Sequence, residues 1–97
     1  MTLDQIKVLS AIAQTGSFRD AAELLHRTQP NLSVVTRNLE KEFGFELFDW
    51  ANYQPVLMTE GAKVLSETEK ISGQIQELES LGKAIRDGVE TDFFNVF

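Results

Sequence analysis

Few residues of this 97-residue chain are suited to making or breaking bonds in a substrate. Cysteine is absent, so the sequence excludes disulfides and cysteine-ligated metal sites, and a single histidine, His26, cannot build a metal site alone. The acid-rich stretches 67–69 and 77–79 are typical of a solvated helix flank rather than of paired carboxylates in a pocket. No nucleophile is paired with a base, so we expect no enzyme, no metal ion and no cofactor.

The side chains between Thr28 and Arg37 are instead suited to recognising double-stranded DNA. An amide such as that of Gln29 can donate and accept at a base edge, and Val34 can contact a thymine methyl group. Arg37 is the cation of this segment that best suits a phosphate, and free N–H groups at a helix start also favour phosphate. The candidate DNA contacts are Arg19, Thr28, Gln29, Pro30, Asn31, Ser33, Val34, Arg37, Tyr53 and Gln54.

Several of these residues also have a purely structural interpretation. Gln29 could bond the local backbone where its helix begins, and Val34 could be no more than an exposed valine. Arg37 could form an ion pair with Glu40 or Glu42 on the same helix. We favour DNA contact for Gln29 and Arg37, and the two interpretations of Val34 have equal weight.

Four further side chains lie outside that segment. Arg19 could hold a phosphate from the first turn of its helix, or belong to a solvated face. Residues 50–54 fall in a predicted turn, where aromatic and amide groups could contact the sugar–phosphate chain or pack inward. We expect Trp50 to pack against the long helix that follows, and Tyr53 and Gln54 to contact DNA.

Two short helices precede the candidate DNA-contacting segment. Apolar residues recur at steps of three and four from Leu3, which predicts a helix that ends before Gly16. Ser17 is a suitable N-cap for a second helix, which we expect to end near His26.

A third helix is predicted from Gln29 to about Glu42, with Thr28 as its cap and Gly44 as its stop. Pro30 fits its first turn, where the missing N–H has no helical partner to lose. Two short helices joined by a tight turn are the minimal helix-turn-helix, whose second helix lies in the major groove. Its predicted buried side consists of Leu32, Val35 or Thr36, Leu39 and Phe43.

A two-stranded hairpin is predicted after the third helix. Segments 45–48 and 55–58 are apolar or alternating, and turn-prone residues lie between them. Because an isolated hairpin is barely stable, we expect it to pack on the helices as a wing.

The predicted fourth helix runs from Thr59 to about Arg86 and is roughly 40 Å long at about 1.5 Å per residue. Its apolar positions follow a heptad spacing, in which Gly82 fills one place. We expect so long a stripe to need a partner helix from a second copy of the chain. The predicted dimerisation residues are Val64, Thr68, Ile71, Ile75, Leu78 and Ile85.

The charge of the chain departs from what DNA binding favours. The net charge is −6, whereas phosphate contacts usually require a basic face. Residues 1–58 carry five basic against seven acidic side chains, and residues 59–97 carry four against eight. The later part therefore holds most of the negative charge, but the first part is still not basic.

A collinear series of short motifs covers roughly residues 3–65. Its members are Gly16-Ser17-Phe18, Ala21-Ala22-Glu23-Leu24-Leu25-His26, Gln29-Pro30-Asn31-Leu32-Ser33, Arg37-Asn38-Leu39-Glu40-Lys41-Glu42-Phe43-Gly44, Leu47-Phe48, Leu57 and Gly61. In this order and spacing the series resembles the LysR-type transcriptional regulators. The resemblance implies a winged helix-turn-helix, a dimerising linker helix and a C-terminal periplasmic-binding-protein-like domain that binds a small-molecule effector.

Five positions depart from the pattern of that family. Val34 and Val35 stand where many members carry a basic or amide pair, and Thr36 stands at a usually apolar core position. Trp50 and Gln54 occupy wing positions that usually or commonly hold arginine, and Met58 precedes rather than supplies the capping threonine. The apolar skeleton is kept while the phosphate-binding charges are thinned, which should weaken binding and flatten its salt dependence.

The expected fold is mainly α: a winged helix-turn-helix of three helices and a β-hairpin, then a long dimerisation helix. We expect residues 1–58 to form the DNA-binding domain and 59–87 the linker helix. Residues 88–97 would be the start of a truncated effector domain or a tail.

The expected function is that of a cytoplasmic, sequence-specific transcription regulator that binds DNA as a homodimer or dimer of dimers. An effector would act only through a C-terminal domain absent from this sequence, and we expect no membrane partner. The alternative is a dimerising interaction module whose DNA binding is weak or lost.

Overall fold

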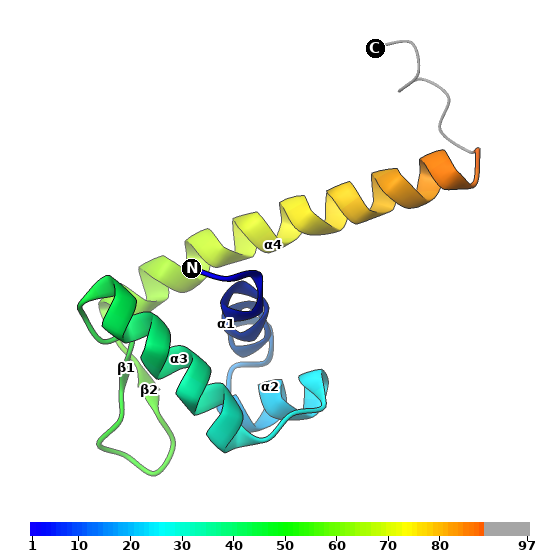
Figure 1. Ribbon diagram of the computed structural model, residues 1–97. Coiled ribbons are helices and arrows are strands. Elements are labelled where there is room, and N and C mark those ends of the chain that lie inside the picture. The colour runs from blue at the N-terminus through cyan, green and yellow to red at the C-terminus, as the bar shows by residue number, and fades with distance from the viewer. Residues whose placement is uncertain (89–97) are drawn as a thin grey trace.

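A computed structural model describes residues 1–88 and has the predicted order of elements (Figure 1). The part of the chain after Gly88, including most of the predicted tail, lies outside the described residues. The elements are α1 (Leu3–Thr15), α2 (Phe18–Leu25), α3 (Gln29–Phe43), β1 (Phe48–Asp49), β2 (Val56–Leu57) and α4 (Thr59–Arg86).

The turn between α2 and α3 forms where the sequence predicted it. His26 ends α2 with a left-handed backbone (φ 56°), and its N–H donates to the carbonyl groups of Ala22 and Glu23. Two residues later, the hydroxyl of Thr28 accepts the backbone N–H of Asn31 at 3.2 Å and caps α3. These local bonds stabilise the change of direction that a helix-turn-helix requires.

Helix α1 lies at the centre of the fold and contacts α2, α3 and α4. On α3 the predicted apolar face is confirmed, because Leu32 and Leu39 are completely buried. Of the two alternatives at the middle of that face, Thr36 is buried while Val35 is half-buried. The hydroxyl of Thr36 donates to the Leu32 carbonyl at 2.9 Å, so burial leaves no unpaired polar atom there.

The hairpin is shorter than predicted, and its first strand begins later. Only Phe48 and Asp49 pair with Leu57 and Val56 in an antiparallel register, so the prediction of a strand over 45–48 was wrong. The physical reason lies in the partners of the preceding backbone, because the N–H of Leu47 donates to the Glu40 carboxylate instead of to a strand.

Helix α4 packs on the body through its first turns and then extends away from it (Figure 1). Gly61, Leu65 and Thr68 are its buried residues, and Met58 caps it without a side-chain hydrogen bond. On α1 the buried hydroxyl of Ser10 bonds Glu69 at 2.7 Å and Ser72 at 3.1 Å. The angle between α4 and the body is therefore set by both apolar and polar contacts. None of the described helices is both long and apolar enough to cross a membrane.

Candidate nucleic-acid interface

The start of α3, the start of α2 and the tip of the hairpin lie on one side of the molecule, and α4 lies on the opposite side (Figure 1). In a helix-turn-helix protein, the first turns of the second helix contact base edges while neighbouring elements contact the backbone of the duplex. The arrangement therefore brings the two groups of predicted DNA contacts, on α3 and on the wing, to a common face.

The predicted contacts on α3 reach the surface to different degrees. Val34 has 58% of its surface exposed, an unusual fraction for a valine on a helix that is otherwise apolar toward the core. The hydroxyl of Thr28 is already used as the helix cap, which favours a structural role for that residue. Of the others, Pro30, Asn31 and Arg37 are exposed, whereas Gln29 and Ser33 are half-buried.

An ion pair that the sequence did not indicate lies beside the first turn of α3. Arg27 donates from Nη1 and Nη2 to the two carboxylate oxygens of Asp4, at 2.7 and 3.1 Å. Its Nε donates to the Asn31 side-chain carbonyl at 2.6 Å. One guanidinium thus joins the start of α1 to the start of α3, and a cation counted as available for phosphate is already paired.

This bidentate contact changes the acid–base behaviour of both partners. The hydrogen bond from Arg27 lowers the pKa of Asp4 below its usual value of 3.8, although partial desolvation opposes the shift. The same bond raises the pKa of Arg27. Asp4 therefore remains ionised, and the pair intact, throughout the neutral and mildly acidic range.

We expect Asp4→Asn to lower the free energy of unfolding slightly at neutral pH, by less than about 1 kcal/mol because the pair is exposed. A group whose folded-state pKa is depressed contributes stability above its unfolded pKa and loses it as pH falls through the folded value. The difference between wild type and variant should therefore be constant at neutral pH and vanish below about pH 3. Urea denaturation at pH 7, 5 and 3 measures it, and a difference that grew toward acid would contradict the assignment.

Trp50 packs inward, as expected, but its partners are not on the long helix. Its ring meets Phe18 and Phe48 edge-on, with centroids 5.5 and 5.9 Å apart. Its indole N–H donates to both carboxylate oxygens of Glu40, at 2.9 and 3.1 Å. The prediction of a contact with α4 is replaced by contacts with α2, α3 and the wing strand.

Glu40 is the residue that joins the wing to the recognition helix, and its role was missed in the sequence. It is 7% exposed and accepts the backbone N–H groups of Leu47 at 2.7 Å and Phe48 at 3.2 Å, besides the indole of Trp50. A buried carboxylate is stable only with such donors around it. Nothing local in the sequence distinguishes Glu40 from its exposed neighbour Glu42, so only the path of the wing reveals it.

Arg37 takes neither of the ion-pair partners considered for it. Glu42 instead accepts the N-terminal amino group of Met1 at 2.9 Å. The Arg37 guanidinium lies over the ring of Trp50, 4.2 Å from its centroid. Among residues 1–88 no carboxylate oxygen lies within 4.0 Å of it, so its charge is not neutralised by a neighbour.

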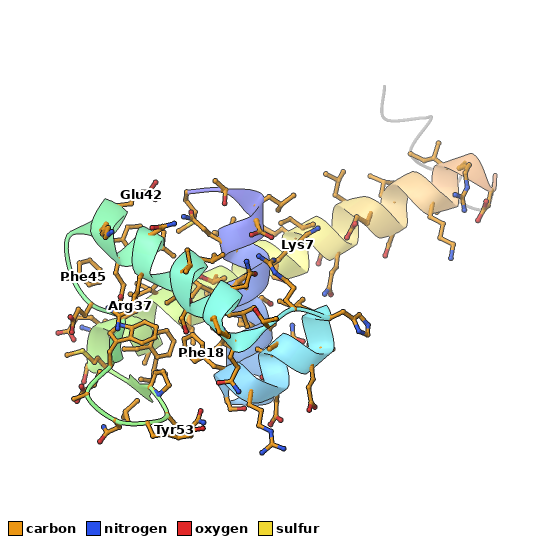
Figure 2. All side chains as sticks on the ribbon, turned by 60° about the horizontal axis from the view of Figure 1, so that its bottom comes forward. Lys7, Phe18, Arg37, Glu42, Phe45 and Tyr53 are labelled. Carbon is orange, nitrogen blue, oxygen red and sulfur yellow. The ribbon has the colours of Figure 1, made fainter. Side chains whose placement is uncertain are left out.

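The remaining predicted DNA contacts lie on exposed surfaces. Tyr53 is 97% exposed at the hairpin tip, where Figure 2 shows its side chain directed away from the body. Gln54 beside it and Arg19 in the first turn of α2 are also exposed, and both border the same surface depression. Exposed aromatic and amide groups at this tip are available to a partner and have no role in the core.

The predicted dimerisation residues differ in what their own chain leaves open. Thr68 is 2% exposed, because it packs against the body and its hydroxyl donates to the Val64 carbonyl. It is therefore covered by the same chain and contributes little to a contact between copies. Val64, Thr68 and Ile71 nevertheless line one apolar groove with Met1 and Phe43. Farther along α4, Leu78 is 68% exposed, Ile85 is 37% exposed and Ile75 is half-buried.

No three histidine, cysteine, aspartate or glutamate side chains gather into a possible metal site within residues 1–88. The ionisable groups described above take part in ion pairs, caps and a buried wing contact. The chemistry of this surface is that of hydrogen bonding and charge.

Comparison with protein families gives a match to a model described as "Bacterial regulatory helix-turn-helix protein, lysR family", over residues 3–63. Curated relatives agree with it. A "Probable RuBisCO transcriptional regulator" of Guillardia theta is 40% identical over a region that covers 82% of this chain and 28% of that protein. The "RuBisCO operon transcriptional regulator" of Allochromatium vinosum is 34% identical and is covered over 28% of its length, with 89% of this chain matched.

Solved structures share the fold. The BenM DBD in complex with catB site 1 DNA has a TM-score of 0.78 at 28% identity, covering 89% of this chain and 97% of that one. Full-length OxyR from Pseudomonas aeruginosa has a TM-score of 0.77 at 32% identity, covering 84% of this chain and 27% of that one. The chain spans between 22% and 28% of the length of the first curated relatives that it matches.

Proposed function

Because the chain belongs to the lysR family of bacterial regulatory helix-turn-helix proteins, we propose that it binds double-stranded DNA as a homodimer and regulates transcription. The observation that carries the proposal is the common face formed by the start of α3 and the exposed wing tip (Figure 1). A likeness to the BenM DBD, whose solved complex contains DNA, supports it.

In the proposed complex the first turns of α3 enter the major groove. Gln29 and Asn31 offer amide groups to base edges, and Val34 offers an apolar surface to a thymine methyl group. Pro30 and Ser33 lie between them, close to the sugar–phosphate chain. Because base contacts rather than phosphate contacts carry sequence information, these side chains would determine the preferred site.

The wing and α2 would position the protein on the duplex. Tyr53 and Gln54 would contact the flanking minor groove or backbone, and Arg19 and Arg37 would each pair with a phosphate. Arg27 is already held by Asp4, so few cations remain for the backbone. We therefore expect binding that depends less steeply on salt than in a protein with a basic DNA-binding face.

We propose that two linker helices join the copies and set the spacing of two DNA half-sites, as dimeric helix-turn-helix proteins require. A dimer of dimers would extend the same principle. The full-length protein would respond to a small-molecule effector through a C-terminal domain, which the family resemblance implies. Its location would be cytoplasmic and its activity that of a regulator rather than an enzyme.

The proposal is tested by titrating the protein into fluorescent genomic DNA fragments and following anisotropy from low to moderate salt. We expect salt-sensitive binding, and Arg37→Ala should weaken it by about tenfold or more, since charge-assisted bonds to phosphate are strong. The slope of log affinity against log salt should become shallower by about 0.9 for each phosphate that the variant no longer neutralises. Arg86→Ala, at the exposed far end of α4, is the matched control and should change neither quantity.

The alternative is an interaction module that dimerises without binding DNA, favoured by the net charge of −6 and by Trp50 and Gln54 at wing positions that commonly carry arginine. Absence of binding at any salt concentration, from a chain that is folded and dimeric, would support this alternative and overturn the proposed function.

A further inference from the structure

The contact between Arg37 and Trp50 is not explained by packing alone. Arg37 leaves the exposed surface of α3 on its wing side, as Figure 2 shows, and its guanidinium lies 4.2 Å from the centre of the indole ring. The negative face of an aromatic ring attracts a cation in this position. An arginine that would otherwise sample many rotamers is therefore held in one place.

Trp50 is itself held from three directions. Phe18 of α2 and Phe48 of the wing strand contact its ring edge-on. Glu40 of α3 accepts its indole N–H through both carboxylate oxygens. The ring cannot turn without breaking these contacts, so it provides a fixed surface between the recognition helix and the wing.

The stacking leaves the charge of Arg37 available. Unlike Arg27, which is neutralised by Asp4, Arg37 has no carboxylate oxygen within 4.0 Å among residues 1–88. A ring face orders the guanidinium but does not use up all of its five N–H donors. Those donors remain free for the oxygens of a phosphate.

We propose that Trp50 is a positioning residue for DNA binding: it orders the Arg37 guanidinium between α3 and the wing so that it meets a backbone phosphate. The inference rests on the proposed function and deepens it. At a position where the family usually supplies an arginine, this chain supplies an aromatic surface that improves the use of the arginine on α3. Part of the thinning of charge in the wing is offset in this way.

The first test is a double-mutant cycle in the DNA titration, with wild type, Trp50→Phe, Arg37→Ala and the double variant. Trp50→Phe keeps a smaller aromatic face, and we expect it to weaken DNA binding by about two- to fivefold, the range of an exposed cation–π contact. In the Arg37→Ala background the same change should have no effect on affinity. Trp50→Leu, which has no ring face, should weaken binding more than Trp50→Phe in the wild-type background only.

A merely structural role of Trp50 would give a different result. If the wing were simply misplaced, Trp50→Phe would weaken binding equally with and without Arg37, because Tyr53 and Gln54 would move as well. Equal losses of affinity in both backgrounds, or no loss in either, would overturn the inference.

The second test requires no DNA, because Trp50 is the only tryptophan in the chain and all indole fluorescence comes from it. Arg37 covers one face of the ring, so Arg37→Ala should raise the acrylamide quenching constant of the free protein, whereas Arg86→Ala should not. Unchanged quenching in Arg37→Ala would show that the stack is absent and would overturn the inference. If wild type fails to bind DNA, the proposed function and the phosphate role fail together, while quenching still decides whether the stack exists.

Discussion

Replacing Gly61 with alanine is expected to lower the free energy of unfolding by about 2–3 kcal/mol, the range for forcing an extra group into a packed interior. A Cβ atom at this position would lie 2.0 Å from the Leu47 carbonyl oxygen and 2.8 Å from Cδ1 of Leu57. Leu47 cannot withdraw freely, because its carbonyl accepts the N–H of Met58 at 3.0 Å. Relief would require α4 and the wing to separate.

The same helix offers a matched control for this substitution. At Gly73 an added Cβ would have no atom within 4 Å, so Gly73→Ala should raise stability by up to about 1 kcal/mol through helix propensity. Urea denaturation at one fixed protein concentration measures both variants, because dimerisation makes stability concentration-dependent. Equal stabilities of the two variants would show that α4 does not approach the wing strand so closely.

Replacing Ile71 or Ile75 with aspartate is expected to convert the proposed dimer into monomers. Ile71 is 38% exposed and borders the apolar groove at the junction of α3 and α4, and Ile75 lies one helical turn farther along. In a two-fold symmetric contact each substitution introduces two carboxylates. At roughly 2 kcal/mol for each unpaired group, the dissociation constant should rise on the order of a thousandfold.

Sedimentation velocity over a range of protein concentrations measures this change. Ser80→Asp is the control, since Ser80 is exposed and lies opposite the heptad stripe on the same helix. Circular dichroism establishes that each variant remains helical, so that dissociation is not confused with unfolding. Aspartate variants that remain dimeric while folded would contradict the role of this stripe in joining the copies. Monomeric variants should also lose most of their DNA affinity, because a single copy can engage only one half-site.

The helices and the turn were predictable because their signals are local. Thr28 caps α3 through a hydrogen bond to a residue three positions away, and His26 closes α2 through bonds to the preceding turn. The burial of Leu32 and Leu39 follows from helical periodicity on one face. Each of these features depends on residues within one or two turns of helix, which the order of amino acids specifies directly.

The candidate DNA contacts were predictable only as a set of residue types on expected elements. Val34 and Arg37 are on the surface as predicted, and Tyr53 extends from the hairpin tip. Their common face depends on the crossing of α3 with the wing. The sequence pattern indicated neither the shortened strands nor which carboxylate would hold them.

By itself, the sequence determined the order of elements, the helix ends and the family of this protein, since caps, periodicity and motif spacing act over a few residues. Only the tertiary structure decided that Glu40 binds the wing, that Arg27 pairs with an aspartate 23 positions earlier and that Trp50 lies beneath Arg37. The physical reason is that a charge or a ring has no fixed role along the chain. Its role depends on which distant groups surround it once burial has removed water and restricted its choice of partners.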